Sequence, residues 1–132
     1  MLDLAPVRQN KTIHDTFKDS LALAKAVEKL DYKRFWLAEH HNIASIASSA
    51  TSVLIGFIAN GTEKIRVGSG GVMLPNHSSL VIAEQFGTLE SLFPNRIDLG
   101  VGRAPGTDGV TAKALGRNPQ NINQHFPHQI QE

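Results

Sequence analysis

Short apolar runs alternate with longer stretches of helical period along this sequence, and no other feature constrains the fold as strongly. The apolar runs, which predict strands, lie at residues 2–5, 34–38, 64–67 and 96–101. Apolar residues then recur at steps of three and four, and the helices that this spacing predicts lie at residues 12–30, 49–60, 78–92 and 108–115. Parallel neighbouring strands need crossover helices between them. The alternation therefore predicts an α/β fold of four strand–helix units with parallel strands.

Particular residues mark the expected helix ends. Thr12 and Asp15 have the spacing of a capping box, and Asp31 can end the first helix because Asp tolerates the left-handed conformation. Ser48 or Ser49 is expected to cap the second helix. The side chains expected to face the core are Ile13, Phe17, Leu21, Ala24, Val27 and Leu30 in the first helix, Val53, Leu54, Phe57 and Ile58 in the second, and Leu80, Ala83, Phe86 (or Gly87) and Leu89 or Glu90 in the third.

The composition argues against several functional classes. The 132 residues include 13 basic and 12 acidic side chains for a formal net charge of +1, which gives no support for a nucleic-acid partner. Cysteine is absent from the sequence, which rules out disulfides, thiolate metal sites and a cysteine nucleophile. The N-terminus lacks the pattern of a secretory signal, and polar residues interrupt the most apolar stretch, residues 43–59. We therefore expect a soluble, cytoplasmic protein without a membrane partner.

Candidate site residues follow the predicted strands, where the sites of α/β proteins lie. Glu39, His40 and His41 come directly after the second strand and offer a carboxylate and two imidazoles. They could act as a general acid or base or hydrogen-bond a ligand. A metal site is less favoured, because adjacent histidines on an extended chain point to opposite faces. The alternative is a capped loop with two ordinary surface histidines.

Glycine-rich segments follow the third and fourth strands. The run from Gly68 to Gly71 would let a ligand approach the backbone, although its spacing is not that of a dinucleotide-binding loop. Its alternative explanation is a crowded strand that needs small residues. Arg103 lies on a glycine-flanked loop, where its guanidinium could bind a phosphate. The alternative for Arg103 is an ion pair with Asp98 or Asp108.

These segments occur together and in order, and in combination they resemble the bacterial luciferase-like monooxygenases. The resemblance is carried by residues 35–42 (FWLAEHHN), 65–77 (IRVGSGGVMLPNH), 83–89 (AEQFGTL) and 96–108 (RIDLGVGRAPGTD). It implies a (β/α)8 barrel that binds reduced FMN, supplied by a separate flavin reductase, and that uses O2 to oxygenate a small organic substrate. A long-chain aldehyde is only an association of the family.

The resemblance also implies roles for individual residues. His40 matches the family's catalytic histidine beside the flavin, and Arg103 matches a residue that holds the FMN phosphate. Gly70 and Gly71 match the site of a non-proline cis peptide near the flavin ring. Further pocket-lining residues, by the same resemblance, are Ala5, Glu39 and Gly102. For Asp98, on the fourth strand, we expect only a structural role.

Length is where this chain departs from the family pattern. A complete barrel takes about 250 residues, so we expect a partial barrel, with residues 1–115 forming an N-terminal half-barrel. Residues 116–132 are expected to be a polar, loosely packed continuation. Because naked parallel edges invite pairing, a homo-oligomer is expected. Two other functions stay open: a non-catalytic fragment that only binds flavin or oligomerises, and a deazaflavin-dependent reductase on the same barrel.

Overall fold

The structure, a computed structural model, describes residues 1–116 and 122–132. Its strands are β1 (Leu2–Asp3), β2 (Arg34–Leu37), β3 (Arg66–Ser69), β4 (Val72–Met73), β5 (Ile97–Asp98) and β6 (Val101–Gly102). Its helices are α1 (Ile13–Lys29), α2 (Thr51–Asn60), α3 (Ser79–Leu92), α4 (Gly109–Ala114) and α5 (Ile122–Gln131), with a short 3-10 turn η1 (Leu74–Asn76).

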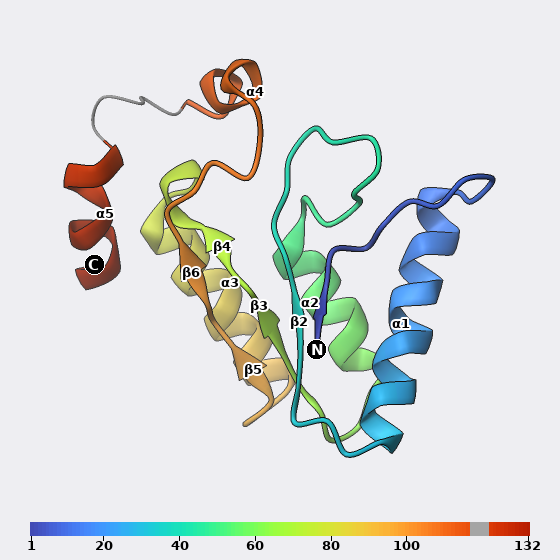
Figure 1. The fold of residues 1–132 in the computed structure, drawn as a ribbon. Helices are drawn as coiled ribbons and strands as arrows, with labels where there is room; N and C mark the ends of the chain where they lie inside the picture. The colour runs from blue at the N-terminus through green and yellow to red at the C-terminus, as the bar shows by residue number, and fades with distance from the viewer. Residues whose placement is uncertain (117–121) are drawn as a thin grey trace.

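Strands β1, β2, β3 and β5 form one parallel sheet in that order, and β4 pairs with β6 in a second parallel ladder. Helices α1, α2 and α3 pack side by side, and α2 and α3 lie against the sheet (Figure 1). The register aligns Leu2, Trp36 and Asp98 with Gly68 on the face of the sheet that points away from these helices. The predicted α/β class with parallel strands is confirmed.

The core lies between the sheet and the three long helices. Phe35, Leu37 and Val67 of the strands are fully buried, as is Ile55 of α2. Burying an aliphatic or aromatic side chain of this size contributes about 1.5–3 kcal/mol. The remaining large members of the cluster come from α2, from α3 and from the strand ends: Leu54, Ile58, Ile65, Val72, Leu74, Ile82, Phe86 and Leu89.

Several predicted core positions are wrong. Leu30, Val53 and Leu80 are each about two-thirds exposed, at 70%, 69% and 67%. Other predicted core residues that lie at the surface are Ile13, Phe57 and Ala83. On α1 the buried stripe instead contains Thr16 and Ser20 beside the correctly predicted Ala24 and Val27. Steps of three and four fit more than one stripe of a helix, and on α1 the prediction chose bulkier residues where Thr16 and Ser20 are buried.

The capping prediction for α1 is confirmed. The hydroxyl of Thr12 accepts from the backbone N–H of Asp15 at 3.1 Å, and the carboxylate of Asp15 accepts from the backbone N–H of Thr12 at 3.0 Å. Asp31, just after the helix, has the expected left-handed conformation with φ of 58°. A second cap forms at α4, where the side chain of Asp108 accepts from the backbone N–H groups of Val110 and Thr111.

The predicted cap of α2 is wrong. The residue before this helix is Ala50, which offers no capping side chain. Ser48 lies deeper, fully buried, and its carbonyl accepts from the hydroxyl of Thr51 at 3.1 Å. The helix therefore begins later than the serines suggest, and Ser48 is a buried residue of the loop before it.

The predicted fourth strand is divided into β5 and β6. The hydroxyl of Ser69 donates to the carbonyl of Gly100 at 2.8 Å and accepts from the N–H of Gly100 at 3.0 Å. The carbonyl of Gly100 also accepts from the backbone N–H of Val72 at 2.8 Å. These contacts join segments far apart in the sequence, and the hydrophobic pattern does not record them.

The C-terminal segment adds one helix beside the sheet. Phe126 of α5 packs against the core cluster, and α5 lies against η1. Residues 117–121 of the expected polar tail lie outside the described residues. Across the part of the chain that the structure describes, no helix combines the length and apolar character needed to cross a bilayer.

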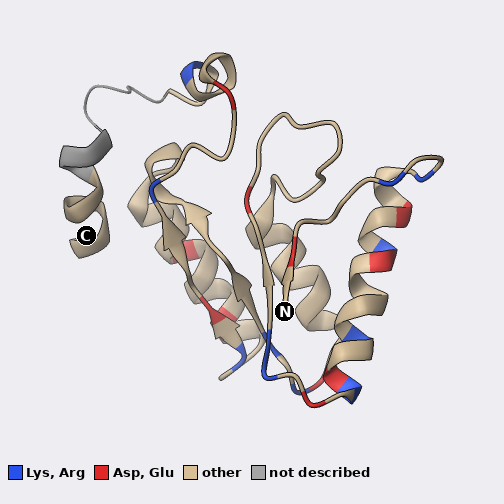
Figure 2. Cartoon of the chain, in the orientation of Figure 1, with Lys and Arg blue, Asp and Glu red and all other residues tan. Residues whose placement is uncertain are grey.

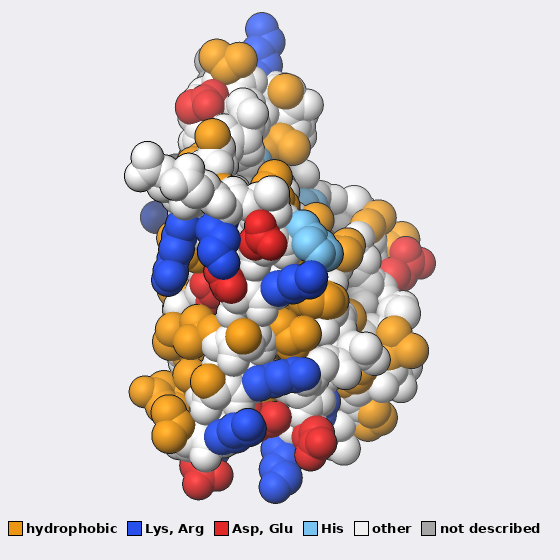
Figure 3. Space-filling view, turned by 90° about the vertical axis from the view of Figure 1, so that its right-hand side faces the viewer, with side chains coloured by type: hydrophobic (Ala, Val, Ile, Leu, Met, Phe, Trp, Pro, Cys, Tyr) orange, Lys and Arg blue, Asp and Glu red, His pale blue; other side chains and the backbone are white. Residues whose placement is uncertain are grey.

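Charged residues of both signs lie along α1 and near the N-terminal ends of β2, β3 and β5 (Figure 2). On the face that carries α1, they are interspersed with hydrophobic side chains (Figure 3). Neither view shows a broad patch of one sign. The loops predicted from the sequence to be functional lie at the other ends of the strands, their carboxyl ends.

Candidate functional site

Three loops meet at the carboxyl ends of the strands, and hydrogen bonds tie them together. The backbone N–H of His41, after β2, donates to the carbonyl of Gly106, after β6, at 3.0 Å. The hydroxyl of Thr107 donates a hydrogen bond to the carbonyl of His41 at 2.8 Å. The side chain of Asn76, in η1, donates to the carbonyl of Pro105 at 3.0 Å. The three segments selected from the sequence therefore form one connected rim.

Glu39 is the hub of this rim. Its side chain is only 2% exposed. One carboxylate oxygen, Oε1, lies 2.7 Å from Nε2 of His41 and 2.8 Å from Nε2 of His77. The other, Oε2, accepts from the backbone N–H of Met73 at 3.1 Å. A carboxylate can only accept, so both imidazole nitrogens act as donors toward it.

The electrostatic environment keeps this carboxylate charged. Burial by itself would raise the pKa of Glu39, but the hydrogen bonds from His77 and His41 outweigh burial and bring the pKa below its usual value. The rim thus encloses a negative charge within a ring of donors. Such a group can orient imidazoles or attract a cation.

His77 was missed as a functional residue. It lies in the segment that carries the family resemblance, but nothing in its local pattern indicates chemistry. The two histidines that contact Glu39 are His41 and His77, which come from different loops. The argument that adjacent histidines point to opposite faces therefore does not apply to them. The ring centroids of these two histidines are 6.2 Å apart.

The predicted cofactor residues occupy different environments. His40 is half-buried, and no side-chain hydrogen bond or ion pair involves it within the described ranges. Arg103 is exposed on the loop after β6, and Gly102 lies in β6 opposite Met73. Ala5 is completely buried, and its carbonyl accepts from the N–H of Ala47 at 3.0 Å. Glu39 is enclosed within the network above, whereas His40 and Arg103 keep solvent access.

The peptide bond between Gly70 and Gly71 is cis. A Cβ at Gly70 would lie 3.0 Å from a methyl of Leu2 and 3.2 Å from the ring of Trp36. A Cβ at Gly71 would lie 2.8 Å from the carbonyl oxygen of Gly100. The neighbouring side chains and strands therefore require small residues here, as the crowded-strand interpretation states.

Asp98 lies away from the rim, on the open face of the sheet. Its carboxylate accepts from Nε of Arg34 at 3.1 Å, from Nε1 of Trp36 at 3.0 Å and from Nε of Arg66 at 2.8 Å. These bonds join three strands, so the side chain has a clear structural role. Its ion pairs are with Arg34 and Arg66, not with Arg103 as one alternative supposed.

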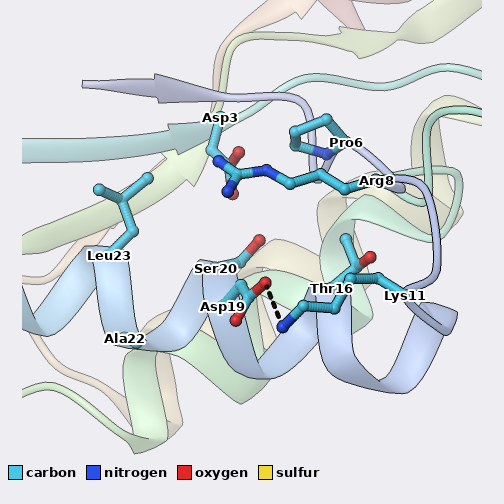
Figure 4. Close-up of a pocket in the computed structure, with 9 residues that line it drawn as sticks. All are labelled: Asp3, Pro6, Arg8, Lys11, Thr16, Asp19, Ser20, Ala22 and Leu23. Carbon is cyan, nitrogen blue, oxygen red and sulfur yellow. Dashed lines mark ion pairs between the residues drawn. The ribbon is translucent and has the colours of Figure 1, made fainter.

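A cavity of roughly 380 Å³ lies elsewhere, between the segment after β1 and α1 (Figure 4). Its wall includes Asp3, Arg8 and Ser20, and an ion pair joins Lys11 to Asp19 at 3.4 Å. It adjoins β1, which pairs with β2 on one side only within the described sheet. The cavity therefore lies at an open edge of the sheet. The side chains that could act together on a ligand lie at the rim instead.

Residues 2–124 match the family described as luciferase-like monooxygenases. The chain belongs to this family. All of it aligns with YvbT of Bacillus subtilis, an uncharacterized protein, at 65% identity, and covers 39% of that protein. It also aligns in full with the N-acetyl-S-alkylcysteine monooxygenase of B. subtilis at 44% identity, covering 40% of it.

Two solved structures share the fold of this chain. Apo-MsnO8 matches 99% of this chain with a TM-score of 0.90 and 39% identity, and the match covers 38% of MsnO8. The oxygenating constituent of 3,6-diketocamphane monooxygenase from Pseudomonas putida, solved in complex with FMN, matches 98% of the chain with a TM-score of 0.83. At 20% identity and 36% coverage of that protein, this likeness shows the fold alone.

The chain thus spans about two-fifths of the length of its luciferase-like relatives. Its strand–helix units correspond to part of a barrel wall, as predicted. The rim described here is the carboxyl end of that wall.

Proposed function

We propose that this chain forms the N-terminal part of a flavin-dependent monooxygenase that uses reduced FMN and O2 to oxygenate a small organic substrate. The observation that carries the proposal is the joining of the three loops around Glu39 at the carboxyl ends of the strands. Sites of barrel enzymes are built from these loops. Membership of the family supplies the reaction class.

The residues of the rim fit a flat, phosphorylated cofactor. Gly70 and Gly71 bring bare backbone to the rim, where an aromatic ring can lie against it. Arg103, exposed one residue after β6, would bind the phosphate through its guanidinium, with Gly102 giving access. When bound, the flavin supplies the activation of oxygen. The protein contributes binding, orientation and exclusion of water.

His40 is proposed as the residue that donates or accepts a proton beside the flavin. It has the side chain that works near neutral pH, solvent access, and no competing partner among the described residues. Glu39 has both oxygens engaged, so we assign it to positioning the loops rather than to contact with the cofactor. Ala5, fully enclosed, would shape the floor of the pocket.

The complete pocket requires more of the barrel than the four units seen here. A longer chain or a second copy of this one would supply it, and a separate reductase would supply reduced FMN. The carbon skeleton of the substrate depends on that remaining part. One relative is named for an N-acetyl-S-alkylcysteine, and an aldehyde is a second substrate class to test.

Titration with FMN and with riboflavin tests the proposal. Replacing Arg103 by Ala should weaken FMN binding by about 1.5–3 kcal/mol, the contribution of a hydrogen bond to a charged group, and should leave riboflavin binding unchanged. Arg8→Ala, which removes an exposed loop arginine beside the other cavity, is the matched control. Equal affinity of the parent protein for FMN and riboflavin would disprove the phosphate contact.

A second experiment addresses catalysis. In a preparation that turns over, His40→Ala should reduce oxygenation while FMN binding persists, and unchanged turnover would refute its role. A protein that binds no flavin in any oligomeric state would favour the non-catalytic alternative. Preference for a deazaflavin over FMN would favour the reductase.

A further inference from the structure

Two imidazoles and one carboxylate, from two loops, converge at the centre of the rim. The ligand-type atoms of Glu39, His41 and His77 all lie within 4.8 Å of one another. These residues follow β2 and η1, so the fold, and not the local sequence, brings them together. The proposed function uses the carboxylate only to position loops and assigns nothing to either imidazole.

We propose that Glu39, His41 and His77 form a binding site for a divalent first-row transition-metal ion of the zinc type. Imidazole nitrogen and carboxylate oxygen are ligands that such ions prefer, whereas magnesium and calcium favour oxygen alone. The set carries one negative charge when the imidazoles are neutral, since the hydrogen bonds keep the carboxylate ionised. A divalent ion would be attracted to this charge in a partly desolvated place.

The spacing of the donor atoms suits one ion. Zinc lies about 2.0–2.2 Å from nitrogen and oxygen ligands, which places neighbouring ligands of a tetrahedron about 3.3 Å apart. The two separations from Glu39 Oε1 are 2.7 and 2.8 Å and would widen by about half an ångström. Each neutral imidazole would move its proton from Nε2 to Nδ1 and bind the ion through the freed Nε2. No net proton is lost when the ion binds to the two neutral imidazoles and the carboxylate.

The surroundings already hold the ligands in place. The N–H of Met73 fixes the second oxygen of Glu39 and leaves Oε1 for the ion. The backbone of His41 is held on both sides, by the carbonyl of Gly106 and the hydroxyl of Thr107. Outer contacts of this kind orient the ligands of metal sites. The set therefore needs little rearrangement on binding.

The site has an entry path and an open position. The side chains of His77 and His41 are 27% and 14% exposed, although Glu39 is almost completely enclosed. Three protein ligands leave a fourth position for water or another small ligand, as in catalytic rather than structural zinc sites. Binding here does not require flavin, so it is independent of the proposed monooxygenase function.

Calorimetric titration of the untagged, metal-free chain with Zn²⁺ tests the site, in the absence of flavin. We expect one ion per chain and no comparable binding of Mg²⁺. His77→Ala and His41→Ala should each weaken Zn²⁺ by more than the roughly 10–100-fold that loss of an outer contact costs. His14→Ala, an exposed histidine on α1, should leave the affinity unchanged.

Co²⁺ provides a second readout, because its visible absorption reports the coordination geometry directly. Intense bands of a four-coordinate ion should appear in the parent protein and disappear in His77→Ala, whose fold is verified by circular dichroism. Absence of Zn²⁺ binding would overturn the proposal. So would binding that survives both histidine substitutions, since it would then arise from other surface groups.

Discussion

Replacing Glu39 by Gln should destabilise the chain more than any other single amide substitution on the rim. The glutamine oxygen can take the place of Oε1 and keep the contacts to both histidines, but its NH2 group would then face the N–H of Met73. A buried donor left without a partner costs about 1–3 kcal/mol, and the remaining bonds weaken when the acceptor loses its charge. We expect a total loss of about 2–4 kcal/mol.

Urea unfolding followed by the fluorescence of Trp36, the single tryptophan, measures this loss. In thermal unfolding of a chain of this length, the same loss should lower the Tm by roughly 7–14 °C. Glu84→Gln makes the same chemical change at an exposed position of α3 and should stay within about 0.5 kcal/mol of the parent. If Glu39→Gln were as mild as Glu84→Gln, the idea that Glu39 is the hub of the rim would be wrong.

Further predictions concern acid stability, the open face and the rim turn. The folded-state pKa values of Glu39 and Asp98 are lowered, although burial alone would raise them. The two carboxylates therefore stabilise the fold fully above their ordinary pKa values of 4.5 and 3.8, and this stabilisation is lost as the pH falls through the lower folded values. The free energy of unfolding, measured from pH 7 downward, should show a plateau and then a decline below about pH 4.5. Asp98→Asn should cost about 1.5–3 kcal/mol and change the emission of Trp36, whose indole N–H bonds to this carboxylate; an unchanged spectrum would contradict the contact. Gly106→Ala should destabilise the fold by about 1–2 kcal/mol because Gly106 has a left-handed φ of 63°. The added Cβ would also lie 2.8 Å from the carbonyl oxygen of Glu39, which increases the cost. A Tm equal to that of the parent would rule out the left-handed turn at Gly106.

The sequence suffices for the features that depend on local chemistry. The alternation of apolar runs and helical periods predicts parallel strands because no other arrangement accommodates short strands joined by amphipathic helices. The capping box of Thr12 and the left-handed Asp31 are also local, since each depends on residues within one turn. These predictions were confirmed for that reason.

The features that depend on contacts between distant segments could not be predicted in this way. Exposure of Leu30 and Val53 depends on how closely α1 and α2 approach each other and the sheet. At Gly100, between β5 and β6, the hydrogen bonds include one from the hydroxyl of Ser69, a residue 31 positions earlier. The pairing of His77 with Glu39 likewise joins positions 38 residues apart, which no local pattern records.

Both edges of the sheet have buried polar or exposed apolar groups that further strands could cover. At β1, one carboxylate oxygen of Asp3 is buried without a hydrogen-bond partner within the described structure, and it adjoins the cavity beside α1. At the other border, Leu99 and Val101 are 46% and 39% exposed. An orphaned buried acceptor and exposed aliphatic side chains are both costly unless something covers them. Because the chain covers about two-fifths of its relatives, we expect the covering elements to be the remaining barrel strands, from a longer chain or from a second copy. A donor beside Asp3 and an apolar partner for Val101 are the contacts that such elements have to provide.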